Sequence, residues 1–325
     1  MSEPLLSVEG LTVAFGPEGA QVRAVEDVSF SVPAGGAVGL VGESGSGKSV
    51  TSLSILRLLA PSATILGGRI LFDGANLLGL PADKMPDIRG RDIAMIFQEP
   101  MSSLNPLMTV GDQIGEAILL HEAVGRGERG RRVVELLRRV GIPDAEERCD
   151  AYPHQFSGGM RQRVMIAMAL ACNPRLLIAD EPTTALDVTI QAQVLDLMRT
   201  LRADTGTAIL LISHDLGVIA EMCDSVVIMY AGRVVETGDV RSIFRDARHP
   251  YTQGLLASIP RLHDERHRLH QIPGSVPSPA HRGAGCAFAP RCPVRQERCT
   301  REQPAFAAIA SDRRVACFAE GSSAA

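Results

Sequence analysis

Short apolar runs separated by glycine and proline dominate the first 80 residues. Residues 5–13, 28–32 and 37–41 are runs of this kind, and their length and bounding turn residues predict β-strands. The third run leads into a Gly-rich loop and then into residues 48–59, whose pattern predicts a helix. An apolar triplet at 70–72, followed by an Asp-Gly turn, predicts a further strand. The amino-terminal region is therefore expected to be rich in β-structure.

The pattern changes between about residues 90 and 165, where charged and apolar residues mix at helical spacing. Residues 110–122 and 131–140 show this spacing most clearly, so the region is predicted to be a helical insertion. The Arg-rich stretch 126–139 is interpreted as the solvated face of a helix.

Three later runs are fully apolar, as in parallel strands buried on both faces. They span residues 176–179, 208–212 and 226–230, and a helical stretch, 190–204, precedes the second. Alternation of strand and helix predicts an α/β fold with a mainly parallel sheet covered by helices. The composition shifts near residue 244. We therefore expect one domain over 1–245 and an appended segment over 246–325.

Composition narrows the classes of function. The net charge of −4, the aromatic content of 4% and the absence of tryptophan disfavour a dedicated nucleic-acid binder, which usually has a basic excess and stacking aromatics. The amino terminus has no signal-peptide pattern. The longest apolar stretch, Val164–Cys172, is far too short to span a bilayer. Any work at a membrane would then require a partner to hold the chain there.

One segment combines the residue types that bind a nucleotide phosphate. Gly42-Glu43-Ser44-Gly45-Ser46-Gly47-Lys48-Ser49 matches the pattern G-x-x-x-x-G-K-[ST] between a predicted strand and a predicted helix. Glycines allow backbone N–H groups to surround phosphate oxygens, and the helix N-terminus attracts the same anion. Lys48 is predicted to reach the outer phosphates of ATP, and Ser49 to bind Mg²⁺.

Two further segments extend this chemistry. The apolar run at 176–179 ends in Asp180 and Glu181. Asp180 is predicted to hold Mg²⁺, and Glu181 to polarise the attacking water. Ser157, Gly158 and Gly159 precede a predicted helix over 161–171, which gives a second helix N-terminus able to bind an anion.

These motifs together resemble those of ABC-type ATPase subunits. The segment from Phe156 resembles the family signature Leu-Ser-Gly-Gly-Gln, with Phe156 and Met160 as departures. The resemblance implies a P-loop core with an antiparallel β subdomain and a helical subdomain over about 90–165. It also implies roles for four more residues. They are Gln98 (Mg²⁺ and the lytic water), Asp187 (the loop across the dimer interface), His214 (the γ-phosphate) and Phe15 (stacking on adenine).

Three stretches resemble the oligopeptide and dipeptide importer branch of that family. They are residues 98–106, 249–256 and 285–293. The resemblance implies an ATP-hydrolysing subunit that powers peptide uptake from the cytoplasmic face of the membrane, as a peripheral protein. The implied partners are a second related ATPase in a heterodimer, two permeases and an extracytoplasmic binding protein. Two ATPases would face each other head to tail, so that Ser157 and Gly159 act on the partner's nucleotide.

Two other functions remain as alternatives. An importer of nickel or another small solute would use nearly the same subunit, because this subunit does not touch the solute. A soluble ABC ATPase acting on nucleic acid is disfavoured, because such proteins tend to carry two cassettes or a long coiled coil, and this chain shows neither.

Four of the seven cysteines crowd into the last 40 residues, at positions 286, 292, 299 and 317. Without a secretion signal, such a cluster favours metal binding over a disulfide. The intervals of five, six and seventeen residues differ from those of most zinc knuckles, and four thiolates would suit zinc or an iron–sulfur cluster. The resemblance implies that Cys286, Cys292, Cys299 and Cys317 form a Cys-rich extension that binds a [4Fe–4S] cluster.

Overall fold

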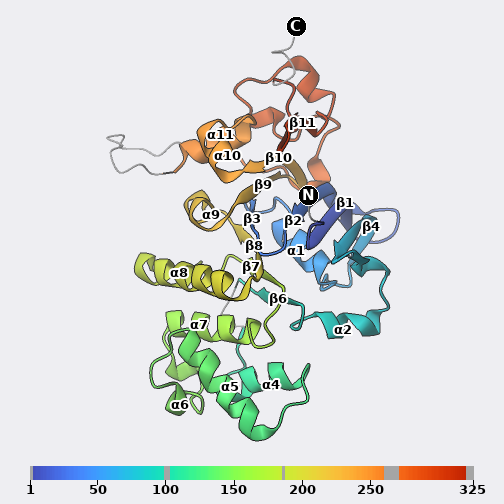
Figure 1. The fold of residues 1–325 in the computed structure, drawn as a ribbon. Coiled ribbons are helices and arrows are strands. Elements are labelled where there is room, and N and C mark those ends of the chain that lie inside the picture. The colour runs from blue at the N-terminus through green and yellow to red at the C-terminus, as the bar shows by residue number, and fades with distance from the viewer. Residues whose placement is uncertain (1–2, 99–102, 185–186, 260–270, 320–325) are drawn as a thin grey trace. The chain divides into compact units, whose positions relative to one another are not determined.

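The computed structural model describes residues 3–98, 103–184, 187–259 and 271–319. The chain forms two compact units (Figure 1). The first unit comprises residues 1–32, 37–78 and 211–325, and the second comprises residues 33–36 and 79–210. The chain passes from the second unit back to the first within β8 (Ala208–Ser213).

The first unit contains an antiparallel sheet in the order β2-β1-β4-β5. Its strands are β1 (Leu6–Phe15), β2 (Val22–Val32), β4 (Ala63–Phe72) and β5 (Ala75–Asn76). This sheet confirms the predicted antiparallel β-structure near the amino terminus. Both β2 and β4 are longer than predicted, because their first halves, which are mostly half-buried or exposed, are held by pairing with β1 rather than by burial.

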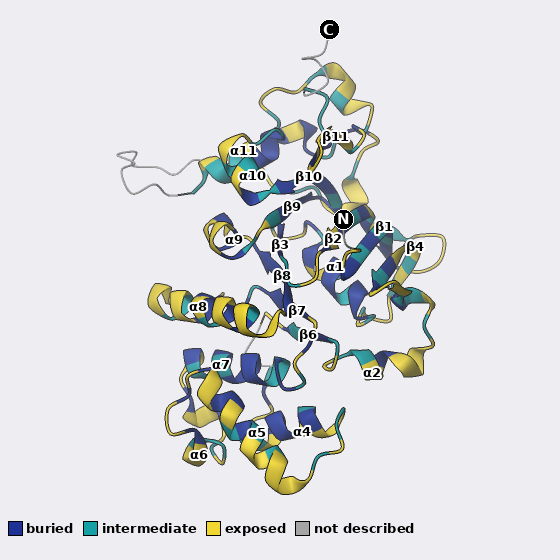
Figure 2. Ribbon diagram, viewed as in Figure 1, coloured by how far each residue is buried: buried dark blue, intermediate teal, exposed yellow. Residues whose placement is uncertain are grey.

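A second group of strands in the same unit begins with β3 (Ala37–Val41), which is buried throughout (Figure 2). β3 runs parallel to β9 (Ser225–Tyr230), which pairs antiparallel with β10 (Arg233–Asp239). The carboxy-terminal hairpin of β11 (Ala307–Ala310) and β12 (Arg313–Val315) adds to β10. The helices of this unit are α1 (Lys48–Ile55), α9 (Leu216–Met222), α10 (Val240–Arg245) and α11 (Pro250–Ala257).

The second unit contains two parallel strands, β6 (Ile93–Ile96) and β7 (Leu176–Asp180), in the register Ile93 to Leu176. Its helices are α2 (Met85–Ile88), α4 (Val110–Leu119), α5 (Arg126–Arg139), α6 (Ala145–Arg148), α7 (Gly158–Ala169) and α8 (Val188–Thr205). Short 3₁₀ turns lie at 77–79, 82–84, 153–155, 279–281, 289–291 and 297–300. The predicted helical insertion is thus helical, and the inner face of α5 buries Val133, Leu136 and Leu137.

Helix α7 begins three residues before the predicted start at 161. Ser157 is its N-cap, and the serine hydroxyl accepts a hydrogen bond from the Met160 N–H group at 3.3 Å. The Ser-Gly-Gly segment therefore forms the first turn of the helix rather than the loop before it. No helix among the described residues is long and apolar enough to cross a bilayer.

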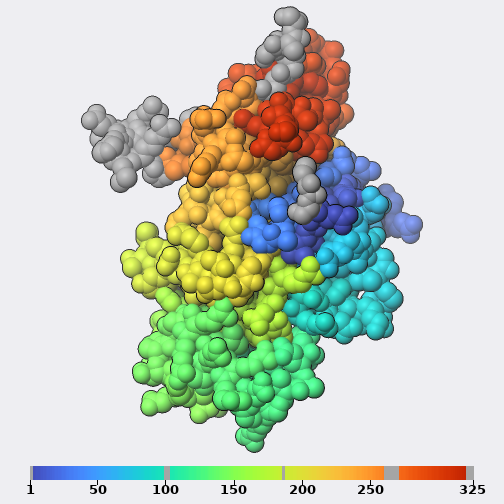
Figure 3. Space-filling model, viewed as in Figure 1, coloured from blue at the N-terminus to red at the C-terminus, as the bar shows by residue number. Residues whose placement is uncertain are grey.

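The carboxy-terminal residues of the first unit pack against its amino-terminal strands. Arg282 donates a hydrogen bond to the Ala24 carbonyl at 3.1 Å, and Figure 3 shows the last described residues, in red, beside the blue amino-terminal residues. Glu236 of β10 is fully buried and accepts hydrogen bonds from the backbone N–H groups of Arg248 and His249. It also pairs with Arg313 of β12 at 2.8 Å. A buried ion pair thus joins the hairpin to β10.

Candidate nucleotide-binding site

The predicted phosphate-binding loop, Gly42–Ser49, lies between β3 and α1. Gly45 and Gly47 have φ angles of 78° and 99°, a region that favours glycine. A Cβ atom at Gly42 would lie 2.3 Å from the Met229 carbonyl oxygen, so this position excludes any side chain. A Cβ atom at Gly45 would meet no atom within 4 Å. The backbone is therefore packed tightly at the start of the loop and open at its centre.

Two polar side chains of this loop are buried. The Lys48 ammonium donates to the carbonyl oxygens of Gly42 at 2.7 Å and Glu43 at 3.1 Å. The Ser46 hydroxyl is buried and finds no hydrogen-bond partner among the described residues. An orphaned hydroxyl is costly unless a ligand satisfies it. With Ser44 and Ser49 exposed beside it, the loop has the donors and the space that fit a phosphate group.

Two other predicted nucleotide contacts belong to the same unit. Phe15 ends β1 and is half-buried, at a position paired with Val22 and Ala63. His214 follows β8 and is exposed, directly before Asp215, the N-cap of α9. Both residues lie at the end of a strand, where a side chain can reach a ligand.

The predicted catalytic carboxylate, Glu181, follows the buried strand β7 in the second unit. Its Oε2 accepts hydrogen bonds from the Gln98 amide at 3.0 Å and from the Thr184 hydroxyl at 2.9 Å. Glu181 has a φ angle of 47°, and a non-glycine residue in this region costs about 1–3 kcal/mol. Asp180 is only 5% exposed. Strain and two donors thus fix the direction of a carboxylate that could orient a water molecule.

The Ser-Gly-Gly segment and Asp187 both contact the same residue, Ile190. Asp187 is the N-cap of α8 and accepts a hydrogen bond from Ile190 N–H at 2.9 Å. A Cβ atom at Gly159 would lie 2.6 Å from Ile190 Cγ2, whereas one at Gly158 would meet no atom within 4 Å. Ile190 therefore connects the first turn of α7 with the first turn of α8.

The predicted site residues are divided between the two units. Phe15, the loop and His214 belong to the first unit, and Gln98, Ser157, Asp180, Glu181 and Asp187 belong to the second. Ser49, Asp180 and Gln98 offer hydroxyl, carboxylate and amide oxygens, which are the ligands that Mg²⁺ prefers. This donor set fits Mg²⁺, whose charge would neutralise phosphate oxygens. The contacts between residues of different units stay a prediction.

The four carboxy-terminal cysteines line one small cavity of about 20 Å³, together with His249, Phe288 and Gln296. Burial raises the pKa values of the Cys286 and Cys292 thiols. None of the seven cysteines, all within the described ranges, is in a disulfide. No group of three or more His, Cys, Asp or Glu residues in the described part of the chain could hold a metal ion. The predicted metal site is therefore not supported by the structure, although its four thiols share a cavity.

Comparison with known proteins decides the family. Residues 25–184 match the family model of the ABC transporter, and residues 235–299 match the oligopeptide/dipeptide transporter carboxy-terminal region. A relative from Brucella ovis, named as a peptide import ATP-binding protein, is 53% identical over 319 residues, which cover 94% of each chain. A relative of the same description from Brucella abortus is 52% identical over 301 residues, covering 93% of this chain and 91% of the relative.

The chain belongs to the ABC transporter ATP-binding subunits of the oligopeptide/dipeptide branch. Solved structures agree with the ABC cassette part of this assignment. The ATP-binding cassette MJ0796, in a dimeric post-hydrolysis state bound to ADP and Pi, has a TM-score of 0.65 and 27% identity, covering 73% of this chain and 99% of the other. CbiO1 from Clostridium perfringens, part of the ABC transporter complex cbiONQ, has a TM-score of 0.66 and 26% identity, covering 75% and 92%.

The cassette also contains contacts that motif reasoning missed. Thr184, Tyr251 and Arg291 all make hydrogen bonds to predicted site segments. Thr184 could have been suspected from its place three residues after Glu181. Tyr251 and Arg291 lie more than 200 residues after the loop in the sequence, and no spacing rule predicts their contacts. Part of the branch-specific stretch 98–106, residues 99–102, lies outside the described residues.

Proposed function

We propose that this cassette binds and hydrolyses ATP to power the uptake of peptides through membrane permeases. The observation that carries the proposal is the match of one chain to both the ABC transporter family and the oligopeptide/dipeptide carboxy-terminal region. The Brucella relatives named as peptide import ATP-binding proteins support the same reading. A nickel importer of the same branch would differ mainly in its permeases and binding protein.

The chemistry divides into binding and hydrolysis. Lys48 and the backbone donors of the loop would bind the phosphates, with Ser49, Asp180 and Gln98 as the Mg²⁺ ligands. Glu181 would take a proton from the attacking water as general base. The hydrogen bond from Gln98 to Glu181 at 3.0 Å supports this role, because it holds the base beside a proposed metal ligand. The Ser157 turn would stabilise the nucleotide of a partner cassette.

The assembly we propose contains a second, related ATPase, two permeases and an extracytoplasmic binding protein, with this cassette peripheral on the cytoplasmic face. Closure of two cassettes on ATP and reopening after hydrolysis would shift the permeases between two states. Purification of a tagged chain from its own host should recover permeases and an unlike cassette. Recovery of nucleic acid without permeases would favour the soluble alternative.

Reconstitution in vesicles tests which solute is transported. The assembled transporter, in vesicles loaded with ATP and Mg²⁺, should accumulate a labelled dipeptide or oligopeptide supplied with its binding protein. Lys48→Ala should abolish uptake, and Lys84→Ala, the chain's other lysine, should not. Uptake of Ni²⁺ with no uptake of any peptide would replace peptide by nickel in the proposal.

For the Cys-rich extension, we propose that Cys286, Cys292, Cys299 and Cys317 bind one structural [4Fe–4S] cluster, with zinc as the alternative. The four thiols share one cavity, and a metal would replace their protons. A single zinc ion would bring its sulfur ligands within about 4 Å of one another, since Zn–S bonds are about 2.3 Å. A [4Fe–4S] cluster also takes four thiolate ligands, so the metal content of the purified protein decides between the two.

Anaerobic purification with metal analysis and visible absorption tests the extension. About four irons per chain and a brown colour are expected. Stoichiometric zinc without iron would retain the four-thiol site and exclude the cluster. Replacement of Cys149, Cys172 and Cys223 together should leave the bound metal unchanged.

A further inference from the structure

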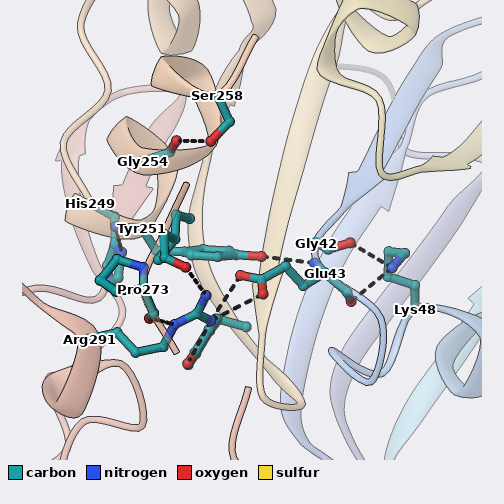
Figure 4. A network of polar contacts seen from close by, with 11 residues as sticks. Gly42, Glu43, Lys48, His249, Tyr251, Gly254, Ser258, Pro273 and Arg291 are labelled. Atoms are coloured by element: carbon teal, nitrogen blue, oxygen red, sulfur yellow. Dashed lines mark hydrogen bonds and ion pairs between the residues drawn. The ribbon is translucent and has the colours of Figure 1, made fainter. Parts of the chain in front are cut away.

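One residue of the phosphate-binding loop contacts the carboxy-terminal part of the chain at two points. The Glu43 backbone N–H donates a hydrogen bond to the Tyr251 hydroxyl at 2.8 Å. The Glu43 carboxylate accepts from Arg291 Nη1, at 3.0 Å to Oε1 and 3.2 Å to Oε2. Figure 4 shows Tyr251 and Arg291 reaching Glu43 from one side, while Lys48 lies on the other.

Arg291 is a buried charge whose hydrogen bonds are made within this network. Its side chain is 5% exposed, and it donates to the Tyr230 hydroxyl at 3.3 Å and to the carbonyls of Ile272 and Pro273 at 3.2 and 2.8 Å. Burial opposes the positive charge, but the Glu43 carboxylate and the Tyr230 hydroxyl outweigh it and raise the pKa of Arg291. The folded state loses much stability when the acidic partner of a buried guanidinium is removed.

Tyr251 has a hydroxyl group whose position is fixed by the surrounding side chains. It is fully buried, with ring centroids 4.7 Å from Tyr230 and 5.5 Å from Phe288. Its backbone N–H donates to Nδ1 of His249, the N-cap of α11, at 3.0 Å. Burial raises the pKa of Tyr251, so the phenol stays neutral and can accept the loop N–H at any physiological pH.

Glu43 also contacts the lysine of the loop. The Lys48 ammonium donates to the Glu43 carbonyl at 3.1 Å and to the Gly42 carbonyl at 2.7 Å. The N–H group of Glu43 is thus held by Tyr251 and its carboxylate by Arg291, while its carbonyl contacts Lys48. A shift of Glu43 would therefore move the groups that are to receive phosphate.

We propose that Arg291 and Tyr251 are positioning residues for nucleotide binding, which hold the phosphate-binding loop in the conformation that presents Lys48 and the loop N–H groups to ATP. The proposal rests on ATP being bound at this loop. It makes the carboxy-terminal extension part of the nucleotide site rather than a separate appendage. A fixed loop binds its ligand more tightly because less ordering is required on binding.

The test measures the affinity of the full-length chain for Mg²⁺-ADP and for a slowly hydrolysed ATP analogue by calorimetric titration. Tyr251→Phe removes one oxygen atom and should raise Kd about 3- to 10-fold, as for one neutral hydrogen bond. Arg291→Lys loses the planar fork and should raise Kd about 10- to 100-fold, as for hydrogen bonds to a charged group. Matched controls are Tyr152→Phe and Arg301→Lys, at exposed positions, which should leave Kd unchanged.

A double-mutant cycle shows whether the network positions the loop for the nucleotide or only attaches the carboxy-terminal extension to the loop. Glu43→Gln and Arg291→Lys remove the same contact, so the double variant should bind no more weakly than the worse single variant. Tyr251→Phe acts on a different atom of Glu43 and should add to Glu43→Gln. If the network only anchored the extension, Arg291→Lys would lower the midpoint of urea unfolding and leave the nucleotide Kd unchanged.

The outcomes separate this inference from the proposed function. Wild-type binding that Lys48→Ala weakens, with Tyr251→Phe and Arg291→Lys both within twofold of wild type, would overturn the inference and retain the ATP site. Absence of Mg²⁺-nucleotide binding by the wild-type chain would overturn both. If Arg291→Lys does not fold, Tyr251→Phe decides alone, because the loss of one hydroxyl leaves the packing of the ring intact.

Discussion

The phosphate-binding loop and the Ser-Gly-Gly segment both place a helix N-terminus where ATP phosphates are predicted, but their surroundings differ. Helix α1 begins after Gly47 with no side-chain cap, and the loop before it contains the buried side chains of Ser46 and Lys48. Tyr251 and Arg291 hold the loop from a distant part of the chain. The loop is therefore fixed by tertiary contacts.

The Ser-Gly-Gly segment is fixed by its own cap and, at Gly159, by close packing against Ile190 of α8. Ser157 caps α7 with its own hydroxyl, both Ser157 and Gly158 are exposed, and a Cβ atom at Gly158 would meet no atom within 4 Å. This contrast suits the different tasks proposed for the two helix ends. A loop that binds phosphate within its own chain gains affinity from being held in advance, whereas a turn that closes on a partner's nucleotide must stay open.

The largest expected effect separates hydrolysis from binding. Glu181→Gln should lower the ATPase rate of the assembled transporter by about 10²–10⁴, the usual loss for a general base, while the loop still binds ATP. Single-turnover hydrolysis and nucleotide titration measure the two quantities. Glu135→Gln, on the exposed face of α5, is the control. Turnover within threefold of wild type would remove Glu181 from this role.

Loss of the ion pair between the extension and β10 should destabilise the unit that contains the phosphate-binding loop. Arg313→Ala leaves the fully buried Glu236 carboxylate without its 2.8 Å partner, which should cost about 3–5 kcal/mol of unfolding free energy. Arg301→Ala removes only an exposed pair with Glu297 and should cost at most about 1 kcal/mol. Equal midpoints of urea unfolding for the two variants would contradict the role of the buried pair.

Binding at the loop should depend on its lysine. Lys48→Ala should raise the Kd for Mg²⁺-ATP about 10- to 100-fold, because it removes hydrogen bonds to charged phosphate oxygens. Lys84→Ala is a matched control, since Lys84 is exposed and lies 3.9 Å from Asp87. An unchanged affinity in Lys48→Ala, measured by titration, would exclude this loop as the phosphate site.

The smallest expected effect tests the exposed Ser-Gly-Gly segment. Ser157→Arg should leave ATP binding at Lys48 of the same chain intact and lower the ATPase rate of the assembled transporter about tenfold, the lower end of the loss for one hydrogen bond to a charged group. Gly130→Arg, where a side chain would meet no atom within 4 Å, should change neither quantity. Efficient cross-linking of Ser157 to Gly47 within one monomer would refute action on the partner's nucleotide.

The strands could be predicted wherever burial alone determines the pattern of apolar residues. The strand over 37–41 was predicted with its observed bounds, because every residue in it is buried. The stretch 63–69 of β4 was missed, because most of it is half-buried or exposed and is held by pairing with β1. The hairpin of β11 and β12 was not predicted from the sequence, since β11 is exposed throughout and β12 has only three residues.

The candidate site was predictable to the extent that its chemistry depends on local spacing. Lys48 and Glu181 follow from contiguous motifs. The resemblance implied that Gln98 acts at Mg²⁺ and the lytic water, but its hydrogen bond to Glu181 was not predicted, because 82 residues lie between them. Arg291 and Tyr251 could not be predicted at all. Their contacts with Glu43 depend on how α11 and the turn at 289–291 pack, and local sequence does not encode that packing.

The discontinuity of the first unit has a consequence for its biosynthesis. The apolar strand β3 pairs with β9, about 190 residues further along the chain. At a translation rate of about 5–20 residues per second, this partner leaves the ribosome about 10–40 s later. The contiguous stretch 79–210 of the second unit can fold in that interval. A nascent chain therefore carries an apolar strand without its β9 partner for many seconds, and such a strand is prone to aggregate until the partner emerges.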